Sequence, residues 1–230
     1  MVGNIGQSKS NQIQQEVGTS IYIHWPFCQS LCPYCDFNSY VEKNIDQYEW
    51  GLAYKKAINL AAKQSDKNIV NSIYFGGGTP SLMKPALVSK IINQVAINFN
   101  LDTEVEISLE ANPGSVDYQN FKSYSADGVN RCSIGIQALN NKDLRILGRV
   151  HTVRDAIKAY EVSQSCFRTS SFDLIYGRPK QSVSDWQEEL QRALNLYPQH
   201  LSLYQLTIEP NTTFFELQKR KRLGGLPNDE

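Results

Sequence analysis

The chain has 230 residues with 23 basic and 23 acidic side chains, so its net charge of zero gives no electrostatic case for nucleic-acid binding. No run of eighteen apolar residues occurs, so the sequence offers no candidate for a membrane-spanning helix. Five cysteines without a secretory signal disfavour a disulfide framework.

Residues 1–19 are polar and lack the apolar core of a signal peptide and the arginine richness of a transit peptide, so we expect a disordered leader in a cytoplasmic protein. Strand-like and helix-like segments alternate after it, which indicates parallel strands joined by crossover helices. The predicted strands are 20–24, 69–75, 104–110, 130–137, 170–176 and 200–207. The predicted helices are 46–62, 85–99, 117–125, 142–147, 152–163 and 182–196, with capping boxes at Thr152 and Ser182. In the last of these helices, the residues expected to face inward are Trp186, Leu190, Ala193, Leu194 and Tyr197.

Two of the predicted strands alternate between apolar and polar side chains. Since successive side chains of a strand point to opposite faces, the apolar set should face the helices and the polar set the barrel interior. Buried parallel strands are usually apolar throughout, so a polar interior indicates a bound polar ligand; alternatively, the polar groups satisfy one another or hold water. The interior sets are Glu106, Ser108 and Glu110 in the first strand, and Arg131, Ser133, Gly135 and Gln137 in the second.

Three cysteines, Cys28, Cys32 and Cys35, follow the first predicted strand with the spacing C-x3-C-x2-C. Three thiolates on one loop can hold three irons of a [4Fe-4S] cluster and would leave the fourth iron open for chemistry. A disulfide with one free thiol, or a zinc site completed by His24, are the alternatives. The cluster is favoured over zinc because structural zinc ligands usually come from two separate pairs, and no second pair follows.

A run of glycines at residues 76–80 (Gly-Gly-Gly-Thr-Pro) follows the second predicted strand. Glycine permits positive φ and lets a ligand approach the backbone closely. The phosphate-loop pattern G-x4-G-K-[ST] is absent, and a plain tight turn is the other interpretation. Because barrel enzymes place their sites at the C-terminal ends of strands, this run, the cysteine loop, Glu110, Gln137 and Asp173 should lie together.

These motifs, with the segment Tyr22-x-His24-x-Pro26-Phe-Cys28, resemble the radical S-adenosylmethionine (SAM) enzymes over about residues 20 to 213. Within them, the chain is similar to the group that contains oxygen-independent coproporphyrinogen III dehydrogenase and the HemW-type heme chaperones. The resemblance implies an α/β fold, a partial (β/α)6 TIM-like barrel, which agrees with the six predicted strands. It also implies a [4Fe-4S] cluster whose open iron is chelated by SAM, and radical chemistry that starts when an electron from the cluster cleaves SAM.

The same resemblance implies roles for the other candidate residues, none of them catalytic. The glycine run would contact the SAM amino group, Arg149 would bind a carboxylate through its planar guanidinium, and Asp173 could hold ribose hydroxyls. The implied cofactor residues are Tyr22, Tyr34, Gly77, Gly78, Thr79, Glu110, Gln137, Arg149, Asp173 and Thr207, and the cluster ligands are Cys28, Cys32 and Cys35.

Phe37 separates two functional hypotheses. The dehydrogenase branch carries a further cysteine two residues after the third, so Phe37 favours a heme chaperone over radical decarboxylation of coproporphyrinogen III. The implied partners are heme or a porphyrinogen, a heme-accepting client protein, and an electron donor such as flavodoxin or ferredoxin. A shortened, inactive barrel is a third hypothesis.

Two further features depart from the relatives. Arg178 stands where they usually carry an apolar residue, and it could meet an acidic group or face solvent. In the relatives a C-terminal domain follows the barrel and helps cover the substrate, so we expect residues 214–230 to begin such a domain.

Overall fold

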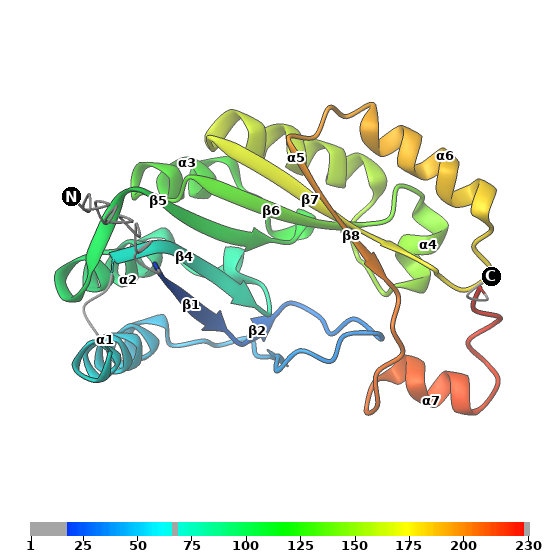
Figure 1. Cartoon of the computed structure of the whole chain (residues 1–230). Helices are drawn as coiled ribbons and strands as arrows, with labels where there is room; N and C mark the ends of the chain where they lie inside the picture. Colours follow the sequence, from blue (N-terminus) through cyan, green and yellow to red (C-terminus); the bar gives the residue numbers. More distant parts are fainter. Residues whose placement is uncertain (1–17, 66–68, 228–230) are drawn as a thin grey trace, which may run out of the picture.

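The structure, a computed structural model, describes residues 18–65 and 69–227, so most of the predicted leader lies outside the described residues. One parallel sheet has the order β1-β4-β5-β6-β7-β8, in which each strand lies beside the next one along the chain (Figure 1). Its strands are β1 (Thr19–Trp25), β4 (Ile69–Gly77), β5 (Asn100–Ala111), β6 (Arg131–Gln137), β7 (Thr169–Tyr176) and β8 (His200–Gln205). Because β1 and β8 form the two edges of this sheet, the predicted partial barrel and its α/β class are confirmed.

The crossover helices lie on the outer face of the curved sheet (Figure 1). They are α1 (Gln47–Gln64), α2 (Pro85–Asn98), α3 (Tyr118–Ala126), α4 (Asn141–Ile146), α5 (Val153–Cys166) and α6 (Val183–Leu194), and α7 (Thr213–Lys219) follows the last strand. Short 3-10 helices at Pro80–Leu82 and Pro113–Ser115 follow β4 and β5, and β2 (Phe27–Cys28) pairs with β3 (Tyr40–Val41). No helix in the described part of the chain is long and apolar enough to cross a membrane.

Local sequence signals set where the helices begin. Thr152 and Ser182 each cap a helix, and their side chains accept hydrogen bonds from the backbone N–H groups of Asp155 and Asp185. Each aspartate carboxylate in turn accepts from the backbone of its capping residue, so both predicted capping boxes are confirmed.

The inner face of α6 differs from its prediction. Leu194 and Tyr197 are 49% and 86% exposed, while Glu189, which was not expected inside, is only 4% exposed. The helix ends at Leu194, so Tyr197 lies beyond it, in the turn before β8, with a positive φ of 50°. Glu189 is buried because its carboxylate lies 2.5 Å from the guanidinium of Arg178, a pairing that helical periodicity cannot reveal.

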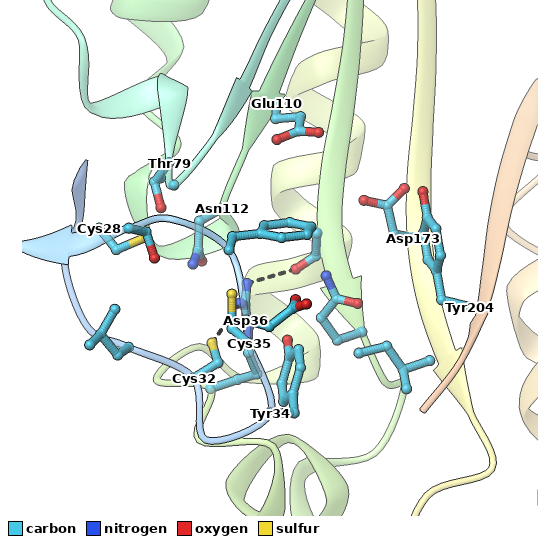
Figure 2. A pocket seen from close by; sticks show the side chains of 18 of the residues that line it. Cys28, Cys32, Tyr34, Cys35, Asp36, Thr79, Glu110, Asn112, Asp173 and Tyr204 are labelled. Atoms are coloured by element: carbon cyan, nitrogen blue, oxygen red, sulfur yellow. Dashed lines mark hydrogen bonds between the residues drawn. The ribbon is translucent and has the colours of Figure 1, made fainter. Parts of the chain in front are cut away.

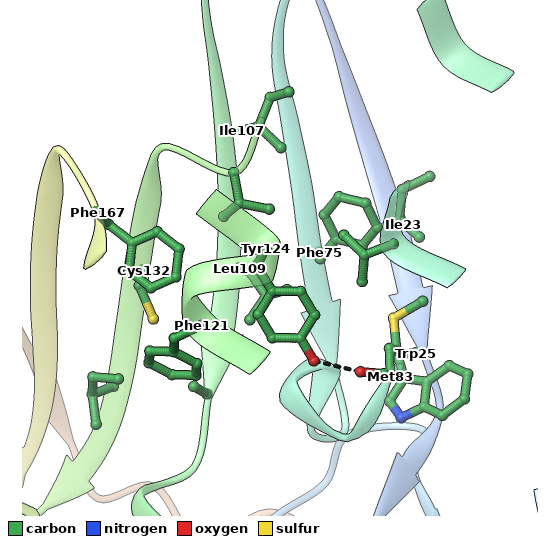
Figure 3. Packing of buried hydrophobic residues seen from close by; sticks show 14 of the residues in the cluster. Ile23, Trp25, Phe75, Met83, Ile107, Leu109, Phe121, Tyr124, Cys132 and Phe167 are labelled. Carbon is green, nitrogen blue, oxygen red and sulfur yellow. Dashed lines mark hydrogen bonds between the residues drawn. The ribbon is translucent and has the colours of Figure 1, made fainter. Parts of the chain in front are cut away.

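The hydrophobic core fills the space between the sheet and the helices (Figure 3). Ile107 and Leu109 of β5 and Cys132 of β6 point into it, as the alternation of those strands predicts. Tyr124 of α3 reaches across this core and donates a hydrogen bond to the carbonyl of Met83. Each fully buried aliphatic or aromatic side chain stabilises the fold by about 1.5–3 kcal/mol. Burial raises the pKa of the Cys132 thiol, so this cysteine remains neutral and belongs to the core.

A second, smaller core joins the two ends of the described chain. Phe214 of α7 is 2% exposed and packs with Leu144, Leu147 and Leu206. Its backbone N–H donates to the carbonyl of Pro33, in the cysteine loop, at 2.8 Å. The start of α7 is therefore packed beneath the cysteine loop; the further domain expected from residue 214 stays a prediction.

Candidate functional site

A cavity of about 460 Å³ opens at the C-terminal ends of the strands, between the cysteine loop and the barrel mouth. Figure 2 shows side chains from the loop and from several strand ends pointing into it. Twelve of the thirteen predicted site residues line it: Cys28, Cys32, Tyr34, Cys35, Gly77, Gly78, Thr79, Glu110, Gln137, Arg149, Asp173 and Thr207. Residues from distant parts of the chain therefore meet at the C-terminal ends of the strands, where barrel enzymes place their sites.

The cysteine loop presents three free, half-buried thiols to the cavity. It is a tight loop, since the N–H of Cys35 donates to the carbonyl of Cys32 at 3.1 Å. Burial raises the pKa of the Cys35 thiol, and the neighbouring Cys32 and Cys28 raise it further. A hydrogen bond from the backbone of Phe37 lowers this pKa but does not outweigh burial. The three thiols occur as free cysteines, so the disulfide alternative is not supported.

The zinc alternative lacks its fourth ligand. His24 Nε2 lies 2.9 Å from the carbonyl oxygen of Asn38, and its Nδ1 lies 3.4 Å from the Tyr22 hydroxyl. Among the described residues, no three His, Cys, Asp or Glu side chains lie close enough together to share one metal ion. Three thiols on one loop, with no fourth protein ligand in the described part of the chain, suit a polynuclear cluster, in which each thiolate binds a different iron.

Arg149 places a positive charge against the thiols. Its Nη1 lies 3.3 Å from Cys32 Sγ, and its Nη2 donates to the carbonyl of Gly135 at 2.9 Å. Burial alone would lower its pKa, but the neighbouring Tyr34 and Cys32 together raise it, so the guanidinium stays charged. Its Nε is buried without a hydrogen-bond partner in the described structure. A buried donor of this kind is costly unless paired, so the site fits an anionic group such as a thiolate-bound cluster or a carboxylate.

The glycine run brings the cysteine loop close to the end of β4. The N–H of Gly78 donates to the carbonyl of Trp25 at 2.7 Å, and that of Thr79 donates to the carbonyl of Phe27 at 2.8 Å. A Cβ on Gly78 would lie 2.6 Å from the Phe27 carbonyl oxygen. Gly77 has a φ of 110°, which side-chain-bearing residues rarely adopt. The two glycines therefore serve loop packing as well as lining the cavity.

Two carboxylates lie across the cavity from the thiols (Figure 2). Glu110 accepts a hydrogen bond from the Tyr74 hydroxyl at 2.7 Å, and Asp173 accepts one from Ser133 at 3.0 Å. Burial raises the pKa of Glu110, opposed by the Tyr74 hydrogen bond and reinforced by the charge of Asp173. Burial likewise raises the pKa of Asp173, against hydrogen bonds from Ser133 and Ser202. Two such carboxylates favour a positively charged ligand, which would lower both pKa values.

Polar groups deeper in the barrel partly satisfy one another. Arg131 donates to the hydroxyl of Ser108 at 3.3 Å and to that of Ser171 at 3.2 Å. Ser171 in turn donates to Ser133, which donates to Asp173. In this deeper layer, therefore, the polar side chains hydrogen-bond to one another, which is the alternative to binding a ligand.

Gln137 and Tyr34 both lie at the cavity. Gln137, the last residue of β6, has a φ of 75°, a left-handed conformation that costs on the order of 1–3 kcal/mol at a residue other than glycine. Such strain often marks functional positions. Tyr34 packs against Phe214, with ring centroids 6.2 Å apart, and burial raises the pKa of its hydroxyl.

Two predicted residues stand elsewhere than expected. The predicted last strand includes Thr207, but β8 ends at Gln205, and Thr207 reaches the cavity from the segment beyond it. Tyr22 does not line the cavity; it is 57% exposed and stacks on Tyr74, with ring centroids 6.1 Å apart. It precedes the end of β1 by three residues, about 10 Å below the barrel rim at strand spacing.

Sequence reasoning missed several cavity residues. Asn112 follows β5, in the same Glu-Ala-Asn-Pro segment as Glu110, and its side-chain oxygen accepts from the N–H of Gly114 at 3.1 Å. Tyr204 of β8 lies near Asp173 in Figure 2, and burial raises its pKa. In β8, Tyr204 points to the opposite face from Leu201 and Leu203, and this alternation could have placed it in the barrel interior. Asp36, between Cys35 and Phe37, had no such signal.

A family model described as the radical SAM superfamily matches residues 22–193, well over half of the chain. This chain belongs to the radical SAM superfamily. Membership implies an iron–sulfur cluster and SAM as cofactors, and the free thiols, the unpaired guanidinium N–H and the facing carboxylates fit both.

Individual radical SAM relatives resemble most of the chain. Radical S-adenosyl methionine domain-containing protein 1, mitochondrial, from Danio rerio is 38% identical over 215 residues, covering 93% of this chain and 48% of its own length. Heme chaperone HemW of Escherichia coli is 40% identical over 199 residues, covering 85% of this chain and 52% of its own. The solved structure of coproporphyrinogen III oxidase (HemN) from Escherichia coli has a TM-score of 0.78 at 27% identity, over 93% of this chain and 49% of that one. The chain thus spans about half the length of these radical SAM relatives.

Proposed function

We propose that this chain is the radical SAM core of a HemW-like protein, with Cys28, Cys32 and Cys35 as ligands of a [4Fe-4S] cluster. The observation that carries the proposal is that three free thiols, a charged guanidinium and two half-buried carboxylates face one cavity of about 460 Å³. Three thiolates leave one iron without a protein ligand, as a catalytic metal site requires.

The cavity side chains then divide the binding of SAM between them. SAM carries a sulfonium, an amino group and a carboxylate. The Arg149 guanidinium supports the negative charge of the cluster–carboxylate end, and Glu110 and Asp173 support the positive groups and the ribose. The glycine run, with Thr79, holds the loop through the N–H groups of Gly78 and Thr79 and lines the cavity, where its backbone would contact the SAM amino group. When bound together, the cluster and SAM supply one-electron reductive cleavage of SAM, and the protein supplies position and exclusion of water.

We assign heme transfer to client proteins as the function. Phe37, where the dehydrogenase branch carries a cysteine, lines the cavity and is 63% exposed, and Leu31 and Tyr204, which also line it, are each 56% exposed. Exposed apolar and aromatic side chains in the cavity lining suit a flat apolar ligand such as heme. The 40% identity to Escherichia coli HemW supports the same assignment. A client protein, an electron donor such as flavodoxin or ferredoxin, and a cytoplasmic location complete the proposal.

The similarity to HemN favours a second candidate, radical decarboxylation of coproporphyrinogen III. One anaerobic experiment separates the two functions. The cofactor-reconstituted protein is assayed for iron and sulfide, titrated with heme, and incubated with coproporphyrinogen III, SAM and dithionite. About four irons and four sulfides per chain with tight heme binding and no protoporphyrinogen support the chaperone. Protoporphyrinogen formation would establish the dehydrogenase, and absence of iron would refute both functions.

A further inference from the structure

A buried arginine lies behind the cavity, outside the set of cofactor residues. Arg178 is 1% exposed and follows β7, in the turn before α6. Its Nε donates to Asp143 at 2.9 Å, its Nη1 to the carbonyl of Ile175 at 2.5 Å, and its Nη2 to Glu189 at 2.5 Å. One planar guanidinium thus joins α4, the end of β7 and α6, a spanning geometry that a lysine cannot reproduce.

The acidic partners of Arg178 extend this network toward the cavity. The other carboxylate oxygen of Glu189 accepts from the N–H of Leu139 at 2.5 Å. Leu139 follows Gln137 by two residues, directly after the left-handed turn of the backbone at φ 75°. Glu189 therefore holds the segment that leaves the strained Gln137 position.

The second acidic partner of Arg178, Asp143, lies in α4, the short helix that leads to Arg149. The backbone N–H of Arg149 donates to the carbonyl of Leu144 at 2.8 Å, so its position depends on that of α4. The third anchor, Ile175, itself lines the cavity. The three groups that Arg178 binds are thus tied to three parts of the cavity wall.

Stability alone does not account for such a network. A buried ion pair gains little over apolar residues of similar volume, because desolvation offsets the Coulomb attraction, and its better-supported use is to specify one geometry. Side chains behind a first layer of ligands orient that layer in metal and cofactor sites.

We propose that Arg178 is a positioning residue: through Asp143, Glu189 and the Ile175 carbonyl, it holds Arg149 and Gln137 in place for SAM. This inference rests on the proposed SAM binding for one of its readouts. Hydrogen exchange of the cofactor-free protein supplies a second, independent readout.

The test compares wild type with R178L and with the triple variant R178L/D143N/E189Q. R178L leaves two carboxylates without their buried partner and should lower the melting temperature. The triple variant removes that charge imbalance, and the amide oxygen introduced by E189Q would still accept from the N–H of Leu139, so its melting temperature should return close to that of wild type. R168L is the matched control, because Arg168 pairs with Glu104 at 3.1 Å in an exposed position.

The positioning role predicts that the triple variant retains its iron but binds SAM about tenfold more weakly, with faster exchange across residues 137–149. Wild-type SAM affinity and wild-type exchange in that variant would overturn the proposal. If wild type itself bound no SAM, the proposed function would fail. Hydrogen exchange across residues 137–149 of the cofactor-free protein would then be the sole test of whether Arg178 holds that segment in place. Should the triple variant not fold, R178K, which keeps the charge, receives the same two measurements.

Discussion

Opposite charges occupy different sides of the cavity at the scale of single residues. Arg149 contacts Cys32, whereas Glu110 and Asp173 lie across from the three thiols (Figure 2). Each of these charges is largely removed from water, so each would gain from a ligand of opposite sign. A zwitterionic ligand with a carboxylate at one end and a sulfonium in its middle matches this arrangement, which is why single substitutions here should affect binding more than folding.

Cys32 is expected to be indispensable for the cluster. Changing Cys32 to Ala removes one of three ligands, so the anaerobically reconstituted variant should lose its iron and its visible absorbance. Cys166, a free half-buried cysteine outside the motif, gives the matched control: C166A should bind as much iron as wild type. Full iron content in C32A would contradict the ligand assignment.

Glu110 gives a prediction whose sign follows from its pKa. Because burial raises its pKa in the folded protein above the usual 4.5, ionising Glu110 costs folding free energy. That cost is absent below the usual pKa and grows as the pH rises through the folded-state value. The free energy of unfolding of cofactor-free wild type should therefore fall relative to E110Q as the pH rises from 4 to 8.

Urea unfolding at several pH values measures this difference. In the reconstituted protein, E110Q should also weaken SAM binding about tenfold while sparing iron, because a neutral amide no longer attracts a positive ligand. The opposite pH trend, or loss of iron, would assign Glu110 to the scaffold instead.

The junction between β4 and the cysteine loop is the decisive contact at the scale of elements. Gly78 and Thr79 donate backbone hydrogen bonds to Trp25 and Phe27, which precede Cys28. The ends of β1 and β4 thereby fix where the loop leaves the sheet. The geometry of the thiols consequently depends on a glycine about fifty residues away along the chain.

Gly78→Ala tests this junction. The added Cβ would meet the Phe27 carbonyl at 2.6 Å, and a backbone atom can relieve the clash only if the loop moves. We expect a loss of about 1–3 kcal/mol in unfolding free energy and reduced iron retention. Gly225, which has nothing within 4 Å of its Cβ position, is the control, and G225A should change neither quantity. Equal behaviour of both variants would mean that the loop is not clamped there.

The whole molecule is tied together beneath the cysteine loop. Phe214, from the last helix, packs against Tyr34 of the loop and donates its N–H to Pro33. Leu144 and Leu147, between β6 and Arg149, belong to the same small core. Residues from the two ends of the described chain and from its middle therefore share one cluster under the cofactor cavity.

Phe214→Ala should accordingly act on both stability and the cofactor. Truncating a buried phenylalanine costs about 3–5 kcal/mol, and the cavity left beneath the loop should accelerate iron loss. The neighbouring Phe215 is half-buried, so F215A should cost clearly less. Denaturant unfolding and the rate of iron release to a chelator measure the two effects, and iron release unchanged in F214A would separate α7 from the site.

The sequence by itself determined the six strands, the partial barrel and which residues line most of the cavity. Apolar and polar residues alternate with a period of two in β5 and β6, and parallel strands bring their C-terminal ends to one edge whatever their separation along the chain. Local chemistry likewise determined the capping boxes at Thr152 and Ser182.

Only the tertiary structure decided matters that depend on contacts between distant segments. Tyr22 lies three residues before the C-terminal end of β1, too far from the rim of the barrel to line the cavity. Thr207 reaches the cavity from the segment after β8. Glu189 is buried, where apolar residues of α6 were expected, because the turn before α6 brings Arg178 against it and Arg178 also binds Asp143 of α4. A strand pattern specifies the face of a side chain but neither its depth nor its partner, because both depend on how the elements pack.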